Sequence, residues 1–175
     1  MSQIVLIVNE RRQVVAVNRQ VRNMFPENGA RWVGKRPGEL FGCVHPPEGP
    51  DGCGTARFCA TCGAVEAILQ GGKQQEQVTR ECRLRVQSPG GTQAFDLRVT
   101  ATPVAVNTDR LTVCAIEDIS DRKRLAVLQR MFFHDVLNTA GGIKGYAEIL
   151  SHELSSHPRC GEDARQMVDL ASQLI

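Results

Sequence analysis

Several features that would indicate a particular partner or location are missing from this sequence. The formal net charge is only +2 over 175 residues, which is too small to indicate nucleic acid as the main partner. No apolar run approaches the roughly 18 residues that span a bilayer. The N-terminus lacks the basic start and the long apolar stretch of a signal peptide. We therefore expect a cytoplasmic protein with no membrane segment and no nucleic-acid partner.

The chain is long enough for one globular domain and a smaller appendage, and 42% of its residues are apolar, which is enough for a core. It contains seven cysteines. In a chain without an export signal, cysteines indicate metal or redox chemistry rather than structural disulfides.

The first 120 residues show the patterns of strands at both ends. Two short apolar runs, at 4–8 and 14–17, predict adjacent strands, and a short helix is expected over 18–25. Alternating apolar residues predict three more strands around 82–86, 95–101 and 111–115. This order favours an α+β fold with an antiparallel sheet that buries one face.

The middle of this region, residues 26–63, is rich in glycine and proline and predicts irregular structure with short helical turns. A short helix over 64–69, ended by Gly71 and Gly72, should follow it. Four cysteines with the spacing C-x9-C-x5-C-x2-C lie in a stretch at 43–63, which we interpret as a Cys-rich insertion. They are Cys43, Cys53, Cys59 and Cys62.

Four thiolates within twenty residues can surround one metal centre. Zinc sites usually contain two short Cys-x2-Cys pairs, whereas only Cys59 and Cys62 form one here, so we favour an iron–sulfur cluster over zinc. His45 could replace one ligand. Free thiols, or a redox disulfide between Cys59 and Cys62, are the alternatives. We expect Cys82 and Cys114 to be small core residues of strands.

From residue 121 the apolar period changes from two to about three and a half. This predicts a long helix with an apolar seam, followed after Pro158 by a second amphipathic helix that looks truncated at residue 175. The seam residues are Leu125, Leu128, Phe132, Val136, Thr139, Ile143, Tyr146 and Leu150.

His134 lies roughly 200° around that helix from Phe132, away from the seam. Asp135 could hydrogen-bond one ring nitrogen and make the other a better nucleophile. Asn138 lies one turn later, where its amide could contact a phosphoryl group. These three residues are candidates for phosphotransfer chemistry; an ordinary solvated histidine is the alternative.

Residues 121–175 resemble the dimerisation and phosphoacceptor domain of two-component sensor histidine kinases, through the stretches at 134–138 and 145–150. The resemblance implies that His134 is autophosphorylated, with Asp135 as its acid/base partner, and that Asn138 assists later hydrolysis of the regulator's phosphate. It also implies a homodimer whose long-helix hairpins form a four-helix bundle, and a response regulator receiver domain as partner. The family often has proline where Thr139 stands.

Residues 1–120 resemble a PAS sensor domain, through the paired first strands, the short helix after Asn18 and the three closing strands. The segment Asp118-Ile119-Ser120 looks like the junction that joins such domains to a signalling helix. The resemblance implies a PAS-like antiparallel sheet with flanking short helices. The sequence around the cysteines differs from that of PAS domains that bind flavin covalently.

We therefore expect the sensor and phosphoacceptor portion of a histidine kinase that detects redox state or oxygen. The sequence has no glycine-rich nucleotide-binding segment, and no room remains after residue 175 for the ATPase domain that would bind ATP and Mg²⁺. The kinase activity would therefore belong to a longer parent protein. A non-catalytic phosphotransfer or dimerisation adaptor, and a zinc-braced binding module, are the alternative functions.

Overall fold

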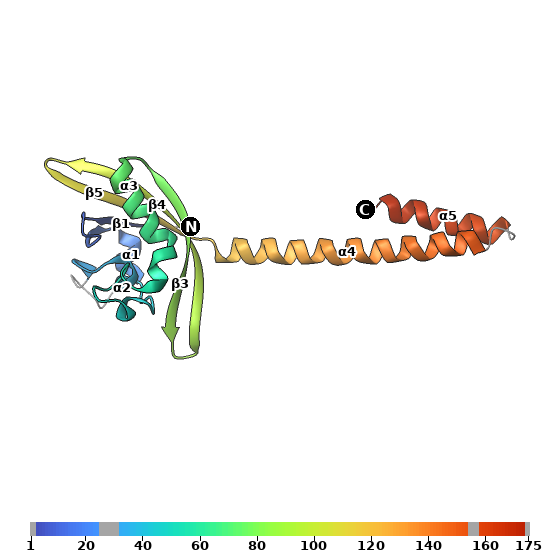
Figure 1. The fold of residues 1–175 in the computed structure, drawn as a ribbon, viewed down its shortest axis with the longest axis horizontal. Helices are drawn as coiled ribbons and strands as arrows, with labels where there is room; N and C mark the ends of the chain where they lie inside the picture. The colour runs from blue at the N-terminus through green and yellow to red at the C-terminus, as the bar shows by residue number, and fades with distance from the viewer. Residues whose placement is uncertain (1–2, 25–31, 154–157, 174–175) are drawn as a thin grey trace. The chain divides into compact units, whose positions relative to one another are not determined.

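In the computed structural model the described residues are 3–24, 32–153 and 158–173 (Figure 1). The chain divides into two compact units, Met1–Asp121 and Arg122–Ile175. The first unit contains five strands and several short helices. In chain order these are β1 (Ile4–Val8), β2 (Val14–Val17), α1 (Arg19–Met24), α2 (Pro37–Leu40), η2 (Pro46–Glu48), η3 (Arg57–Thr61), α3 (Gly63–Gln74), β3 (Val78–Ser88), β4 (Gly91–Val106) and β5 (Asp109–Asp118).

The five strands form one antiparallel sheet in the order β2-β1-β5-β4-β3. The first strand, β1, therefore lies one place in from the edge strand β2, and the last strand, β5, lies between β1 and β4. The predicted strands and their antiparallel pairing are confirmed, although β3 and β4 extend beyond the predicted ranges as a long hairpin. Strand β5 thus occupies the centre of the sheet, directly before the long helix.

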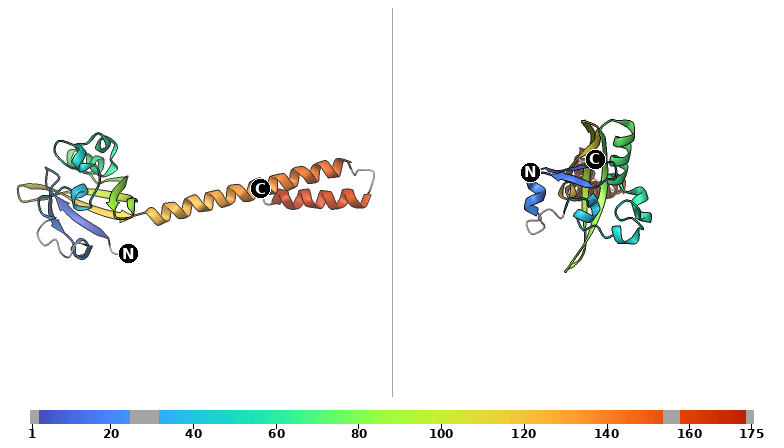
Figure 2. Two further views of the ribbon diagram at one scale, coloured as in Figure 1. Left: turned by 90° about the horizontal axis from the view of Figure 1, so that it is seen from below. Right: turned by 90° about the vertical axis from the view of Figure 1, so that its left-hand side faces the viewer.

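The core lies between the sheet and the helices of this unit. Helix α3 packs on β3, β4 and β5 (Figures 1 and 2). The buried cluster contains thirteen residues from both layers: Leu6, Val8, Val14, Val17, Val21, Leu40, Ala67, Ile68, Val78, Val99, Ala101, Cys114 and Ile116. Cys114 is a core residue, as predicted.

Helix α3 is longer than predicted. We expected it to end at Gly71 and Gly72, but it continues to Gln74, and Gln75 adopts the left-handed conformation that ends it (φ 55°). The physical reason at Gly71 is close packing. A Cβ atom there would lie 3.3 Å from the carbonyl oxygens of Ala101 and Glu76, which is a tight contact, so glycine lets α3 lie close to the sheet.

The second unit contains the remainder of α4 (Ser120–Glu153) and α5 (Pro158–Gln173). Helix α4 runs without a break through Gly141 and Gly142. Pro158 begins α5 rather than ending a helix, which agrees with the preference of proline for the first turn. One chain therefore contains a long helix and not a four-helix bundle.

None of the described helices is both long and apolar enough to cross a membrane.

Candidate functional site: a cysteine-lined cavity, a strand-to-helix clamp and an exposed histidine

The predicted cysteine ligands come together at one cavity of about 290 Å³ between the irregular segment and the sheet. Cys43, Cys53, Cys59 and Cys62 all line it. The chain brings them there from separate elements, since Cys43 and Cys53 lie in loops, Cys59 lies in η3 and Cys62 is the N-cap of α3. All four are free thiols.

The loop that carries Cys53 is held by two charged side chains at α2. Arg36 donates hydrogen bonds from Nη1 to the carbonyl oxygens of Asp51 and Cys53, the latter at 3.1 Å. Glu39 accepts hydrogen bonds from the backbone N–H groups of Cys53, at 3.1 Å, and Arg36, at 3.0 Å. The flanking Gly52 and Gly54 have φ of 76° and 90°, which other residues rarely adopt. The turn around Cys53 is therefore closely defined.

The segment that carries Cys43 is joined directly to the sheet. Cys43 forms an isolated antiparallel bridge with Val86 of β3, and the N–H of Val44 donates to the carbonyl oxygen of Arg85 at 2.9 Å. The cysteines that line the cavity are therefore connected to two elements, because Cys43 is paired with β3 and Cys62 is the N-cap of α3.

A fifth cysteine, Cys82 on β3, also lines the cavity. The pKa of Cys62 is lowered to about 6, chiefly because Cys82 donates a hydrogen bond to its thiolate. Backbone N–H groups of Ala64 and Val65 and the positive charge of His45 lower it further, while burial opposes them. The same hydrogen bond, together with burial, raises the pKa of Cys82. Cys62 is therefore the thiolate of this pair.

Cys53 has the opposite tendency. The pKa of Cys53 is raised to about 11, chiefly by burial; a backbone hydrogen bond from Gly38 opposes the change, and charge repulsion from the other three predicted ligand cysteines adds to it. The thiols are therefore close enough to influence one another's ionisation.

Among the described residues, no three His, Cys, Asp or Glu side chains are arranged to hold a single metal ion. Four thiolates around one zinc at about 2.3 Å would lie only about 3.8 Å from one another.

The end of β5 is clamped to β4 where α4 begins. The N–H of Asp96 donates to Oγ of Ser120 at 2.9 Å, and the N–H of Ile119 donates to the carbonyl oxygen of Asp96 at 2.8 Å. Asp118 Oδ1 accepts from the N–H of Ser120 at 2.9 Å. Ile119 and Ser120 are both buried. The Ser120 hydroxyl thus binds β4, whereas Asp118 caps the helix.

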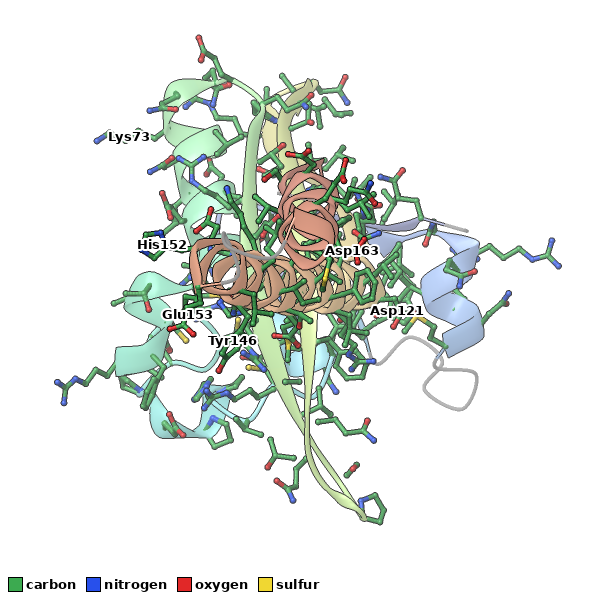
Figure 3. All side chains as sticks on the ribbon, turned by 90° about the vertical axis from the view of Figure 1, so that its right-hand side faces the viewer. Lys73, Asp121, Tyr146, His152, Glu153 and Asp163 are labelled. Carbon is green, nitrogen blue, oxygen red and sulfur yellow. The ribbon has the colours of Figure 1, made fainter. Side chains whose placement is uncertain are left out.

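The imidazole of His134 is on the surface of α4, with 71% of its side chain exposed. Its Nδ1 lies 3.3 Å from Oδ1 of Asp135, and Nδ2 of Asn138 lies 3.2 Å from Nδ1 and 3.3 Å from Nε2. The three predicted residues therefore form one exposed group. Tyr146, which is labelled in Figure 3, is another exposed side chain of α4.

Comparison with known proteins identifies the first unit. The family model of the PAS fold matches residues 1–124, most of the chain, so this chain belongs to the PAS fold family. No curated protein matched the chain.

Similar solved structures include three PAS or sensory-box domains of signalling proteins. A PAS domain from a two-component sensor histidine kinase is 12% identical, with a TM-score of 0.43, covering 66% of this chain and 84% of that chain. The PAS domain of nitrogen regulation protein NR(II) from Vibrio parahaemolyticus is 13% identical (TM-score 0.43; 67% and 89% covered). A sensory box sensor histidine kinase from Vibrio cholerae is 15% identical (TM-score 0.43; 67% and 82% covered).

Sequence reasoning missed the role of Cys82, which we had assigned only to the core. It is partly buried against the core, yet it also contacts the cavity. The alternation of β3 contained the signal, because Cys82 shares a face with Val86, and Val86 is the bridge partner of Cys43. The pairing of Cys43 with Val86 could not be predicted from the sequence.

Proposed function

We propose that this chain is the sensor and phosphoacceptor portion of a two-component histidine kinase whose PAS domain holds an iron–sulfur cluster. Cys43, Cys53, Cys59 and Cys62 would supply its thiolates, and His134 would accept the phosphoryl group. A bound cluster would supply reversible one-electron chemistry, which suits detection of redox state or oxygen. The convergence of four cysteines on one cavity of a PAS domain carries this proposal.

The test of the sensor is a spectrum of the chain purified without oxygen, together with iron, sulfide and zinc analysis. We expect a brown protein with charge-transfer absorption and stoichiometric iron and sulfide. Serine at the buried Cys59 should remove most of the colour, whereas serine at Cys114, which lies in the core, should retain it. A colourless protein with one zinc per chain would instead indicate the zinc-braced module.

The physical connections of the cavity suggest how its state would reach the helix. Cys62 caps α3, and α3 packs on β4 and β5. Strand β4 carries Asp96, which holds Ser120 at the start of α4. We expect a change at the cysteines to shift α3 against the sheet and alter the clamp, and so the position or rotation of α4.

The phosphoacceptor proposal is supported by the exposure of His134 and by its neighbours. A carboxylate at Nδ1 favours the tautomer in which Nε2 is the nucleophile. Asn138 contacts both ring nitrogens, so its amide is near any group bound to the ring. Because transfer needs an ATPase domain, the chain would act within a longer kinase or with a separate kinase domain.

Incubation with a sensor-kinase ATPase domain and labelled ATP tests this step. We expect acid-labile label on the chain, loss of label in His134→Gln, and retention in His152→Gln, which changes another exposed histidine of α4. Subsequent transfer to a receiver domain would identify the response regulator. Absence of label on His134 with every domain tried would leave only a dimerisation role for α4.

A homodimer is part of this proposal, because large apolar side chains of α4 are exposed among the residues that the structure describes. Leu128 and Phe132 are 62% and 65% exposed. Two copies would bury this seam as a four-helix bundle formed by α4 and α5 of each chain.

A further inference from the structure

Two cysteines from different elements meet at the wall of the cavity. Cys62 is the N-cap of α3, and Cys82 lies on β3. The Cys82 thiol donates a hydrogen bond to the sulfur of Cys62, and the backbone N–H of Ala64 is a hydrogen-bond donor to both sulfur atoms. Both side chains are half-buried and line the same cavity. Two thiols that are far apart in the sequence are therefore neighbours.

The backbones that carry these cysteines are in close contact. A Cβ atom at Gly63 would overlap the backbone carbonyl group of Glu81 and would lie 3.1 Å from Cβ of Arg80. Gly63 therefore lets the first turn of α3 lie directly on β3. Cys62 and Cys82 are the residues next to this contact on either side. A disulfide needs such a close approach, with Cα atoms within about 7 Å of each other.

A second contact between α3 and β3 indicates the same pairing. Arg80 donates from Nε to Oε1 of Glu66 at 2.9 Å and from Nη2 to Oε1 of Gln70 at 2.9 Å. Glu66 lies one turn after Cys62, a rise of about 6 Å along the helix. Arg80 lies two residues before Cys82 on the same face of β3, a distance of about 6.6 Å. Nearly equal steps in opposite directions therefore place Cys62 opposite Cys82.

Cys59 is the other candidate partner, because only two residues separate it from Cys62. The N–H of Cys62 donates to the carbonyl oxygen of Cys59 at 3.2 Å, so the two residues share a turn of backbone. The Cys59 side chain is buried, however, and the sulfur of Cys62 accepts its hydrogen bond from Cys82. The contacts of the side chains thus favour the pair that joins the helix to the strand.

We infer that Cys62 and Cys82 are an oxidation site, at which hydrogen peroxide converts the two thiols into a disulfide. The Cys62 thiolate attacks one oxygen of the peroxide, the O–O bond breaks, and hydroxide leaves as Cys62 becomes a sulfenic acid. The sulfur of Cys82 then attacks the sulfur of Cys62. The S–O bond breaks, and the hydroxyl group leaves with the proton of Cys82 as water. The peroxide gains two electrons, one from each sulfur.

This inference goes beyond the proposed function and does not rest on it, because the reaction needs only two thiols and a peroxide. A sulfur in a disulfide is no longer a thiolate, so Cys62 could not bind a metal while the bond persists. The bond would also join the first turn of α3 covalently to β3.

The test uses the full chain, reduced, freed of metal with a chelator and then treated with a small excess of hydrogen peroxide. Digestion with trypsin in the absence of reductant should yield residues 58–73 linked to residues 81–83. Dithiothreitol should separate the two peptides. Because the first peptide contains both Cys59 and Cys62, fragmentation of the linked pair should place the bond on Cys62.

Single substitutions separate the roles of the two sulfurs. Cys62→Ser and Cys82→Ser should both lose the linked peptides, whereas Cys59→Ser should keep them. Cys82→Ser should in addition accumulate sulfenic acid at Cys62, which dimedone labels, because the thiol that displaces the hydroxyl group is gone. Cys114→Ala, in the core, is the control and should behave as wild type.

Three results would overturn the inference. They are a disulfide from Cys62 to Cys59, a link between two chains in place of the internal one, and a Cys62 that stays reduced or becomes sulfinic acid without a link. Each would leave the proposed function standing. A chain that binds no iron but forms the Cys62–Cys82 bond would overturn the proposed function alone.

Discussion

Cys62 differs from an ordinary thiol because its neighbours stabilise its charge. The Cys82 hydrogen bond makes the largest contribution, followed by the N–H groups at the start of α3. A pKa of about 6 keeps Cys62 ionised at neutral pH, where a thiol at the ordinary value of 9 is mostly protonated. Metal and oxidants both react with the thiolate. At neutral pH Cys62 is therefore in the form that binds metal and that reacts with oxidants.

We predict that Cys82→Ala raises the pKa of Cys62 in the metal-free protein, because the largest stabilising contact is lost. The wild-type thiolate should remain reactive until the pH falls through about 6. In the variant the fall should occur at higher pH, so alkylation at pH 7 becomes slower. Iodoacetamide rates against pH, followed at Cys62 by peptide mass spectrometry, measure this. Cys114→Ala is the control, and an unchanged midpoint in Cys82→Ala would contradict the assignment.

At the clamp, Ser120→Ala removes the acceptor for the N–H of Asp96. An unsatisfied group at a buried position costs about 1–2 kcal/mol, so the free energy of unfolding of the PAS unit should fall by that amount in urea. Ser120→Thr keeps the hydroxyl and should recover most of it. Thr108→Ala, at an exposed turn of the same unit, should stay within about 0.5 kcal/mol of wild type. Equal losses in Ser120→Ala and Ser120→Thr would argue against the hydrogen bond.

Some of the contacts between these cysteines could be predicted from the sequence, and others could not. Spacing indicated that Cys59 and Cys62 lie together, since two intervening residues leave little choice. For Cys43, proximity depends on its bridge to Val86, which is far along the chain and has no sequence signature. The same long-range pairing hid the contribution of Cys82.

At the scale of elements, α3 connects the cavity to the sheet. It begins at the thiolate Cys62 and packs along three strands. Its two internal glycines have different surroundings: a Cβ at Gly72 would meet nothing within 4 Å, whereas one at Gly71 would meet backbone oxygens at 3.3 Å. Of these two glycines, only Gly71 lies in a tight contact.

We expect Gly72→Ala to stabilise the PAS unit by about 0.5–1 kcal/mol, because alanine favours the helix and restricts the unfolded chain. Gly71→Ala gains the same propensity but forces α3 away from β4, an overpacking effect of about 1–3 kcal/mol. It should therefore be the less stable of the pair in thermal and urea unfolding. If both variants were equally stabilised, α3 would not be held closely against the sheet.

Strands were predicted better than helix ends for a physical reason. Alternation of buried and exposed residues in β3 and β5 is set by the pleat, so it is visible without the partner strand. The end of α3 is different, because the helix continues through Gly71 and Gly72 in spite of their unfavourable propensity and ends only where Gln75 is left-handed.

For the whole molecule, the exposed seam of α4 is the feature that bears on the proposed dimer. Leu125, Leu128 and Phe132 are each more than half exposed in one chain. Isolated surface leucines are ordinary, but a repeated apolar stripe along a helix is typical of a partnered surface. The heptad-like spacing of the seam was visible in the sequence. The residues that would cover the seam in a dimer belong to a second copy, so a single chain does not show them.

We predict that the chain is a dimer and that Leu128→Asp dissociates it, because each copy would then bury an unpaired charge in the seam. A cost of about 3 kcal/mol corresponds to a rise in Kd of more than about 100-fold, which sedimentation equilibrium can measure. Ala126→Asp adds the same charge at an exposed position of α4 away from the seam, roughly 200° around the helix from Leu128, and should leave the dimer intact. A wild-type chain that stays monomeric at high concentration would contradict the four-helix bundle and leave the cysteine-lined cavity as a property of the single chain.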